Sequence, residues 1–270
     1  MPSATSGKDI VIRNIRVAKK HIILTFFNRE KIQISKEAYL ADYLYKGKTI
    51  SETEIKKLLA ITASSTLLSY ALALLSKKPY TEAEIVEKLK KKGSDEQSTA
   101  LIIAKIKSSN LINDKLFTQN LVAYDSGRNY GKNKIIRRLK NRGIKEEILN
   151  TLVFPLEDEQ KKAEQLLPKL VNRYVSLAFK NQKRRVYQAL IAHGFSHEIA
   201  RQVSNCLKSD SKETERAKLL KDYQILEKRY ARKYNGYELR QRIFRFLVNK
   251  GYEYQDIKKV MEDITNENDC

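Results

Sequence analysis

Residues 135–143 read IIRRLKNRG, and the same nine-residue phrase occurs at three other places in the chain. It reads IVEKLKKKG at 85–93, VYQALIAHG at 186–194 and IFRFLVNKG at 243–251. Each copy has a branched apolar residue, a leucine four positions later and a glycine four positions after that. Apolar residues at i and i+4 share one face of a helix, and glycine is favoured just past a helix end. Each copy therefore predicts a helix that ends at the glycine and is followed by a second helix.

The four glycines recur at a nearly constant interval, since they are 50, 51 and 57 residues apart. A regular period of this length is typical of stacked helical modules. With only 9 Gly and 4 Pro in 270 residues, the composition also favours helices. We predict a mainly α fold, an elongated series of tandem three-helix repeats. The aliphatic residues expected to face the core from the second helices are Ile102, Ile148, Leu152, Ile199, Val203, Ile257 and Val260.

The first 50 residues differ from the rest because β-branched and aromatic residues cluster at 10–17, 21–27 and 31–34. The short polar breaks between them predict hairpin turns and a small antiparallel sheet of three strands. Ser35 is expected to cap a short helix over 36–44, which Lys46-Gly47 would end. The predicted domains are an N-terminal β element plus helix at 1–66 and helical repeats at 67–127, 128–180, 181–222 and 223–270.

Capping residues predict where further helices begin. Ser51 with Glu54, Thr81 with Glu84, and Ser94 with Gln97 all have capping-box spacing. The predicted helices of the first repeat cover 68–76, 82–92, 95–108 and 114–124. Long charged helices are expected at 158–179 and 212–234, and Pro155 should end the helix after Gly143.

Residues 58–75 carry no charge. The stretch is barely long enough to span a bilayer, and five serine and threonine residues interrupt it. We interpret it as the end of one helix and the start of another, both partly buried, with a membrane span as the alternative.

The net charge of +21 and the isoelectric point near 9.7 point to a polyanionic partner, either nucleic acid or a protein coated on nucleic acid. Two cysteines, Cys206 and Cys270, do not form a disulfide framework and suggest a reducing compartment. The start of the chain lacks the apolar core of a signal peptide. We therefore expect a cytoplasmic protein.

The densest basic segment lies at 128–145, and its eighteen residues contain no acid. Ile135, Ile136 and Leu139 must face the core. The side chains expected to project outward and meet phosphates or carboxylates are therefore Lys134, Arg137, Arg138 and Asn141. A solvated helix face is the alternative. The candidate binding residues of this segment and of two later basic clusters are Arg128, Lys132, Lys134, Arg137, Arg138, Lys140, Arg142, Lys183, Arg184, Arg185, Arg240 and Arg242.

Tyrosines interleave with the last basic cluster: Tyr230, Tyr234 and Tyr237. They could stack on unpaired bases or pack between helices with a polar tip, and both interpretations stay open.

Catalytic and metal sites are hard to find. His193 and His197 are four apart, as two metal ligands on one helix would be, but Gly194 lies between them at the expected helix end. No GxxxxGK[ST] phosphate loop and no recognisable carboxylate pair occur. We expect no enzyme activity, no cofactor and no metal.

Four stretches together resemble the RecX family, bacterial regulators of the recombinase RecA. They are LSYALALLSKKPYTEAEIVEKLKKKG at 68–93, LINDKLF at 111–117, GKNKIIRRLKNRGI at 131–144 and ALIAHGFSHEI at 189–199. Lys77, Lys78 and Thr81 stand at the basic-basic-Ser positions of the first family motif, and the likeness covers about 68–207. The fourth copy at 239–261 and the β-rich start resemble longer family members. Lys replaces Arg in the first repeat, and His193 replaces a basic residue.

The resemblance implies a non-catalytic modulator, without a cofactor, that lies in the groove of the RecA–single-stranded DNA filament. It would inhibit RecA and so regulate recombination, DNA repair and the SOS response. Its partners would be the RecA filament, single-stranded DNA and possibly duplex DNA. We expect a monomer with no membrane partner.

A stand-alone DNA-binding helical protein without a recombinase partner is the alternative function. No repeat presents the Asn, Gln and Arg cluster at a helix start that base reading requires. A passive helical scaffold would not need so high a positive charge.

Overall fold

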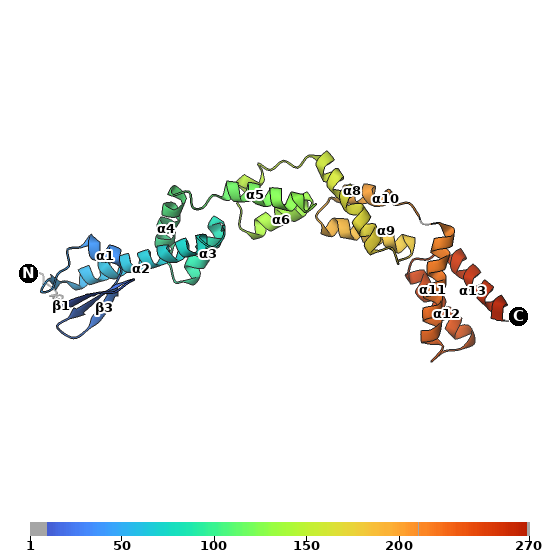
Figure 1. The fold of residues 1–270 in the computed structure, drawn as a ribbon, viewed down its shortest axis with the longest axis horizontal. Helices are drawn as coiled ribbons and strands as arrows, with labels where there is room; N and C mark the ends of the chain where they lie inside the picture. The colour runs from blue at the N-terminus through green and yellow to red at the C-terminus, as the bar shows by residue number, and fades with distance from the viewer. Residues whose placement is uncertain (1–9, 210, 269–270) are drawn as a thin grey trace, which may run out of the picture. The chain divides into compact units, whose positions relative to one another are not determined.

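The computed structural model describes residues 10–209 and 211–268, and Figure 1 shows their ribbon. The chain divides into two compact units. The first unit ends at Thr118 and also takes in Arg142–Ile144; the second comprises Gln119–Asn141 and continues from Lys145. Most described residues are helical, and a small antiparallel sheet lies at the N-terminal end, so the mainly α prediction is confirmed. The four strands are β1 (Ile10–Val17), β2 (Ile22–Phe26), β3 (Lys31–Ile34) and β4 (Thr49–Ile50).

The N-terminal sheet is antiparallel throughout, with strand order β3-β2-β1-β4. The three expected strands form as predicted, and the short strand β4 adds to the edge beside β1. Ile12, Leu24 and Phe26 are almost fully buried. They pack with residues of α1 (Lys36–Ala41) and α2 (Glu52–Leu75), so helices cover one face of the sheet (Figure 1). Ser35 caps α1 by accepting the Ala38 N–H, as its position predicts.

Helix α2 is continuous over 24 residues, so the prediction of two separate helices within 58–75 is wrong. Leu58 is buried in the core of the sheet, whereas Ala71 is buried in the core of the first repeat. The hydroxyls of Thr62 and Thr66 donate to carbonyls four residues earlier. Both hydroxyl groups are therefore hydrogen-bonded within the helix and do not interrupt it. α2 thus links the sheet and the first repeat.

The helices after the sheet can be grouped into four sets of three, and in each set the middle helix carries the repeated phrase. The C-terminal part of α2 combines with α3 and α4, and the later sets are α5 to α7, α8 to α10 and α11 to α13. The bounds are α3 (Glu82–Lys91), α4 (Glu96–Ser108), α5 (Asp114–Gly127), α6 (Lys132–Asn141), α7 (Glu146–Leu149), α8 (Leu156–Arg173), α9 (Phe179–Ala192), α10 (His197–Asn205), α11 (Lys212–Tyr230), α12 (Gly236–Asn249) and α13 (Tyr254–Asn268).

The aliphatic and glycine positions of the repeated phrase behave as predicted. All four glycines have positive φ, between 74° and 96°. Glycine adopts this region without the steric cost that a Cβ brings. The aliphatic pairs before them are fully buried at 0% exposure: Ile85 and Leu89, Ile135 and Leu139, Val186 and Leu190, and Ile243 and Leu247.

Two of the three predicted capping boxes form, at Ser51 with Glu54 and at Thr81 with Glu84. The third prediction is wrong, because Asp95 rather than Ser94 caps α4. The Asp95 carboxylate accepts both the N–H and the hydroxyl of Ser98. An ionised carboxylate favours the positive end of a helix more than a hydroxyl does, so the helix begins one residue later.

The charged helices are shorter than predicted. α8 ends at Arg173 and a separate helix, α9, begins at Phe179, where one helix over 158–179 was expected. α11 ends at Tyr230 rather than at 234. The helix after Gly143 has only four residues and ends at Leu149, so the prediction that Pro155 ends it is wrong; Pro155 instead stands at the N-cap of α8. Ala163, Leu166 and Leu170 of α8 pack with α9 and α10. Leu219, Tyr223 and Leu226 of α11 pack with α12 and α13.

The glycine turns also contact helix starts of the preceding repeat. A Cβ at Gly143 would collide with Ala83 of α3, and one at Gly194 would collide with Lys134 of α6. Backbone hydrogen bonds reinforce the second contact: the Gly131 N–H donates to the His193 carbonyl at 2.9 Å and the Asn133 N–H to the Gly194 carbonyl at 3.0 Å. At Gly251 the neighbour is Asn181 of α9, whose amide donates to the Lys250 carbonyl. Each of these three glycines therefore ends a helix and also permits the close approach of another helix start.

Candidate polyanion-binding surface

Several of the predicted cations lie just before α6 or on it and are accessible to solvent. Arg128, Lys132 and Arg137 are exposed. The Lys134 ammonium lies 3.6 Å from the centre of the Tyr130 ring, and the Arg128 guanidinium lies 5.3 Å from the same ring. Both distances suit cation–π attraction, which orders long side chains while leaving their charge available. The guanidinium also donates to the Tyr124 hydroxyl at 3.1 Å, which raises the pKa of Arg128.

Arg138 differs from its neighbour Arg137 because it pairs with an acid of another helix. Its guanidinium donates to Asp125 of α5, whose carboxyl is fully buried. A buried carboxylate without a partner would be costly, so Arg138 has a structural role in this unit. Residues 128–145 contain no acid, but folding brings acidic side chains from other helices into contact with this basic segment.

Arg142 is also engaged inside the first unit. Its guanidinium donates through Nη2 to one Glu84 carboxylate oxygen at 3.0 Å, and its Nε lies 2.7 Å from the other oxygen. The group also lies 4.8 Å from the Phe117 ring centre. Its carbonyl accepts the Thr81 hydroxyl at 2.6 Å. Glu84 and Thr81 are the capping box of α3, so Arg142 attaches the glycine turn to the start of that helix.

Two more candidates form ion pairs at the surface. Lys140 lies 2.7 Å from Glu146 with both side chains exposed. Arg242 contacts Glu238 at 3.1 Å and lies 3.9 Å from the Tyr234 ring centre. Exposed pairs contribute about 0–1 kcal/mol and exchange readily for another anion. These two cations therefore stay available to a partner.

The remaining candidates carry unneutralised charge. Among the described residues no ion pair involves any of eight candidates: Arg128, Lys132, Lys134, Arg137, Lys183, Arg184, Arg185 and Arg240. They lie just before or on α6, on α9 and on α12. These three helices are the middle helices of three successive repeats, so each presents cations at the same place in its repeat.

Sequence reasoning missed the buried partner of Arg138 and the role of Tyr130 between two cations. Asp125 is thirteen residues before Arg138 and on another helix, so no local spacing rule connects them. A single tyrosine before α6 does not by itself predict contact with the cations on either side of it. The tyrosines of the last cluster divide: Tyr234 lies against Arg242, whereas Tyr237 is 77% exposed.

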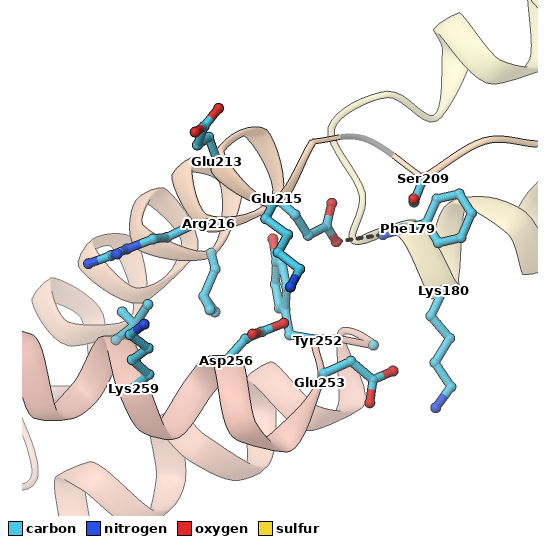
Figure 2. A pocket seen from close by; sticks show the side chains of 14 residues that line it. Phe179, Lys180, Ser209, Glu213, Glu215, Arg216, Tyr252, Glu253, Asp256 and Lys259 are labelled. Carbon is cyan, nitrogen blue, oxygen red and sulfur yellow. Dashed lines mark hydrogen bonds between the residues drawn. The ribbon is translucent and has the colours of Figure 1, made fainter.

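A pocket of about 390 Å³ lies in the second unit, lined by the start of α9, the start of α11 and the α12–α13 turn (Figure 2). Glu215 extends to the start of α9, where it accepts the Phe179 N–H at 2.7 Å. Acids and bases are equally numerous in the lining. A strand of phosphates would meet both signs there, so this pocket is not part of the candidate surface. Its charged lining residues are Lys180, Lys212, Glu213, Glu215, Arg216, Glu253, Asp256 and Lys259.

The two histidines lie in different surroundings. The His193 ring meets Tyr130 edge to face with 5.7 Å between ring centres, whereas Nδ1 of His197 lies 2.7 Å from the Tyr187 hydroxyl. Burial, and secondly the charge of Lys134, lower the pKa of His193 below its ordinary 6.5. Within the described ranges, no group of three His, Cys, Asp or Glu side chains is placed to hold a metal ion.

Comparison with known proteins shows that these helical modules are similar in sequence to known three-helix domains. A model of the RecX first three-helix domain matches residues 68–105, and a model of the RecX third three-helix domain matches twice, at 157–203 and 223–261. The fourth repeat is thus similar in sequence to the third.

Relatives match over almost the whole chain. Regulatory protein RecX of Streptococcus pneumoniae serotype 19F (strain G54) is 30% identical over 258 residues, which cover 93% of this chain and 98% of the relative. Regulatory protein RecX of Lactococcus lactis subsp. cremoris (strain SK11) is 27% identical over 266 residues, with 96% and 98% covered. A crystal structure of regulatory protein RecX superposes with a TM-score of 0.58 at 22% identity, covering 73% of this chain and 99% of that one, which supports the fold.

Proposed function

Because this chain belongs to the RecX family of regulatory proteins, we propose that it is a non-catalytic modulator of a RecA recombinase. It binds the filament that RecA forms on single-stranded DNA and inhibits it. The processes regulated in this way are recombination, DNA repair and the SOS response.

The observation that supports this proposal most directly is the unpaired positive charge on three successive repeats. Arg137 on α6, Arg185 on α9 and Arg240 on α12 are exposed and form no ion pair with a described residue. A filament of protein on DNA offers phosphates and carboxylates at regular intervals. Several weak contacts on linked modules then add through effective concentration, so no single repeat needs high affinity.

The test compares variants in a recombinase ATPase assay on single-stranded DNA. Arg137→Gln with Arg185→Gln removes two free charges, and Lys56→Gln with Lys57→Gln removes two exposed charges from α2 as the matched control. If both arginines contact phosphates, half-inhibition at about 0.1 M salt should need about 25-fold more of the first variant, since each contact carries a log–log salt slope of about −0.7. Inhibition equal to the wild type would overturn this surface.

The stand-alone DNA-binding alternative predicts a different outcome. The protein would then bind naked single-stranded DNA, yet leave recombinase ATPase activity unchanged at concentrations that saturate that DNA. Direct binding to filaments, seen by electron microscopy with and without the protein, separates the two functions.

We also propose that the protein works in the cytoplasm as a monomer without a membrane partner. α2 is the one helix in the described part of the chain that is long and apolar enough to cross a membrane. Its Leu58 and Ala71 are instead buried in two protein cores. This packing supports a structural role for these two residues.

A further inference from the structure

We propose that the open face of the N-terminal sheet is a second binding surface, whose ligand is single-stranded DNA. This surface is separate from the helical repeats and goes beyond the proposed function, because it requires no recombinase.

The register of the sheet defines the open face. Residues directly opposite each other on neighbouring strands share a face. One row across β1, β2 and β3 is Asn14, Thr25 and Lys31, and the next is Arg16, Ile23 and Gln33. The alternate residues, such as Leu24 and Ile34, point into the core with α1 and α2.

This face carries hydrogen-bonding and cationic groups but no acid. Arg16, Lys31 and Gln33 are exposed, and none of the six residues in the two rows is Asp or Glu. The bulge between Ile12 and Asn14 adds the exposed Arg13 to the same strand. An ordinary antiparallel sheet can leave one polar face to water, but such faces usually mix both signs of charge.

The cations near this face are also unpaired. Residues 10–34 contain six cations and one acid, Glu30, whose carboxylate accepts the Asn28 amide at 2.8 Å. In the described chain no ion pair involves any of the six, whereas in the helical repeats many cations are paired. The unpaired set is Arg13, Arg16, Lys19, Lys20, Arg29 and Lys31.

An exposed aromatic side chain favours a single strand over a duplex. Phe27 follows the buried Phe26 at the end of β2 and is 64% exposed. Its N–H donates to the Val11 carbonyl at 3.2 Å, so the backbone beneath the ring is fixed in the sheet. Unpaired bases stack on aromatic side chains while cations contact the backbone, and paired bases cannot do so. An acidic protein surface would pair with the cations, but it has no unpaired bases to stack on the Phe27 ring.

The experiment measures binding of the full-length protein to a fluorescently labelled 30-nucleotide oligothymidylate by anisotropy, at several salt concentrations and without recombinase. Arg16→Gln with Lys31→Gln should weaken binding about 25-fold at 0.1 M salt and reduce the log–log salt slope by about 1.4. Phe27→Ala should weaken binding about 5- to 160-fold with little change in slope. Lys56→Gln with Lys57→Gln is the control of equal charge, and circular dichroism confirms that each variant stays folded.

Three results would overturn the proposal. One is an equal loss of affinity in the sheet variant and in the control, which would mean that only net charge matters. The second is a loss confined to a 30-base-pair duplex measured in the same way. The third is no effect of Phe27→Ala on binding of the single strand. Because no recombinase is present, these results are independent of filament inhibition.

Discussion

Replacing Gly194 by alanine tests whether the glycine turns hold neighbouring repeats together. Gly194 has φ +96°, and an added Cβ would meet the Lys134 nitrogen and the Gly131 carbonyl. Gly93 is the matched position of the first repeat, with φ +85° and no atom within 4 Å of an added Cβ. The two substitutions therefore share the backbone strain and differ only in the contact.

The expected losses in the free energy of unfolding follow from the backbone strain and the steric contact. A Cβ in the left-handed region costs about 1–2 kcal/mol, which is the whole effect expected for Gly93→Ala. Overpacking adds about 1–3 kcal/mol at Gly194, because the obstacle is backbone that cannot rotate away. Gly194→Ala should therefore lower the free energy of unfolding by about 2–5 kcal/mol.

Urea denaturation followed by circular dichroism at 222 nm measures the loss. Since linked repeats need not unfold as one unit, amide hydrogen exchange in α6 and α9 should accompany it. In Gly194→Ala the protection of both helices should fall together. Equal destabilisation by the two alanines, or faster exchange only next to residue 194, would refute the docking role of the glycine.

Other substitutions test the assignments of individual side chains. Arg138→Gln should destabilise the protein by about 1–3 kcal/mol in urea denaturation, because it leaves the buried Asp125 unpaired, whereas Arg137→Gln should stay within about 0.5 kcal/mol; similar values for both would contradict a structural Arg138. Leu139→Ala should cost about 2–5 kcal/mol since Leu139 is 0% exposed, and an unchanged urea midpoint would refute the helix phase. The pKa of His193 is lowered on folding, so the unfolded chain takes up the proton first and stability is lost as pH falls from about 6.5 through the folded pKa. His193→Phe should therefore show a smaller drop in melting temperature between pH 7.5 and pH 5 than the wild type, and an equal drop would argue against this effect.

Much of the local structure follows from the sequence because short-range rules determine it. The Ile135 and Leu139 pair is buried, and Gly143 has positive φ, since both features depend on residues within one helix. The prediction of a helix start failed where two neighbouring residues could each cap the helix. At 94–95 two adjacent capping residues were available, and the carboxylate prevailed.

The candidate site was only partly predictable. The spacing of Ile135 and Leu139 locates the cationic face of the helix. It does not show which of these cations are already paired with an acid and which are free to bind a partner. Arg138 and Arg142 belong to the same run of cations as Arg137, yet each is bonded to an acid of another helix. The open face of the sheet was not among the predicted sites, because its two rows combine residues from three strands.

The sequence by itself determined the repeated helix, its glycine end and its buried aliphatic pair, because each depends on interactions within about ten residues. Only the tertiary structure decided which cations are neutralised, since Arg138 meets an acid 13 residues away and Arg142 one 58 residues away. It also decided that α2 is one helix, because two separate cores bury its two ends. Contacts through space between distant segments set these features, and no local pattern encodes them.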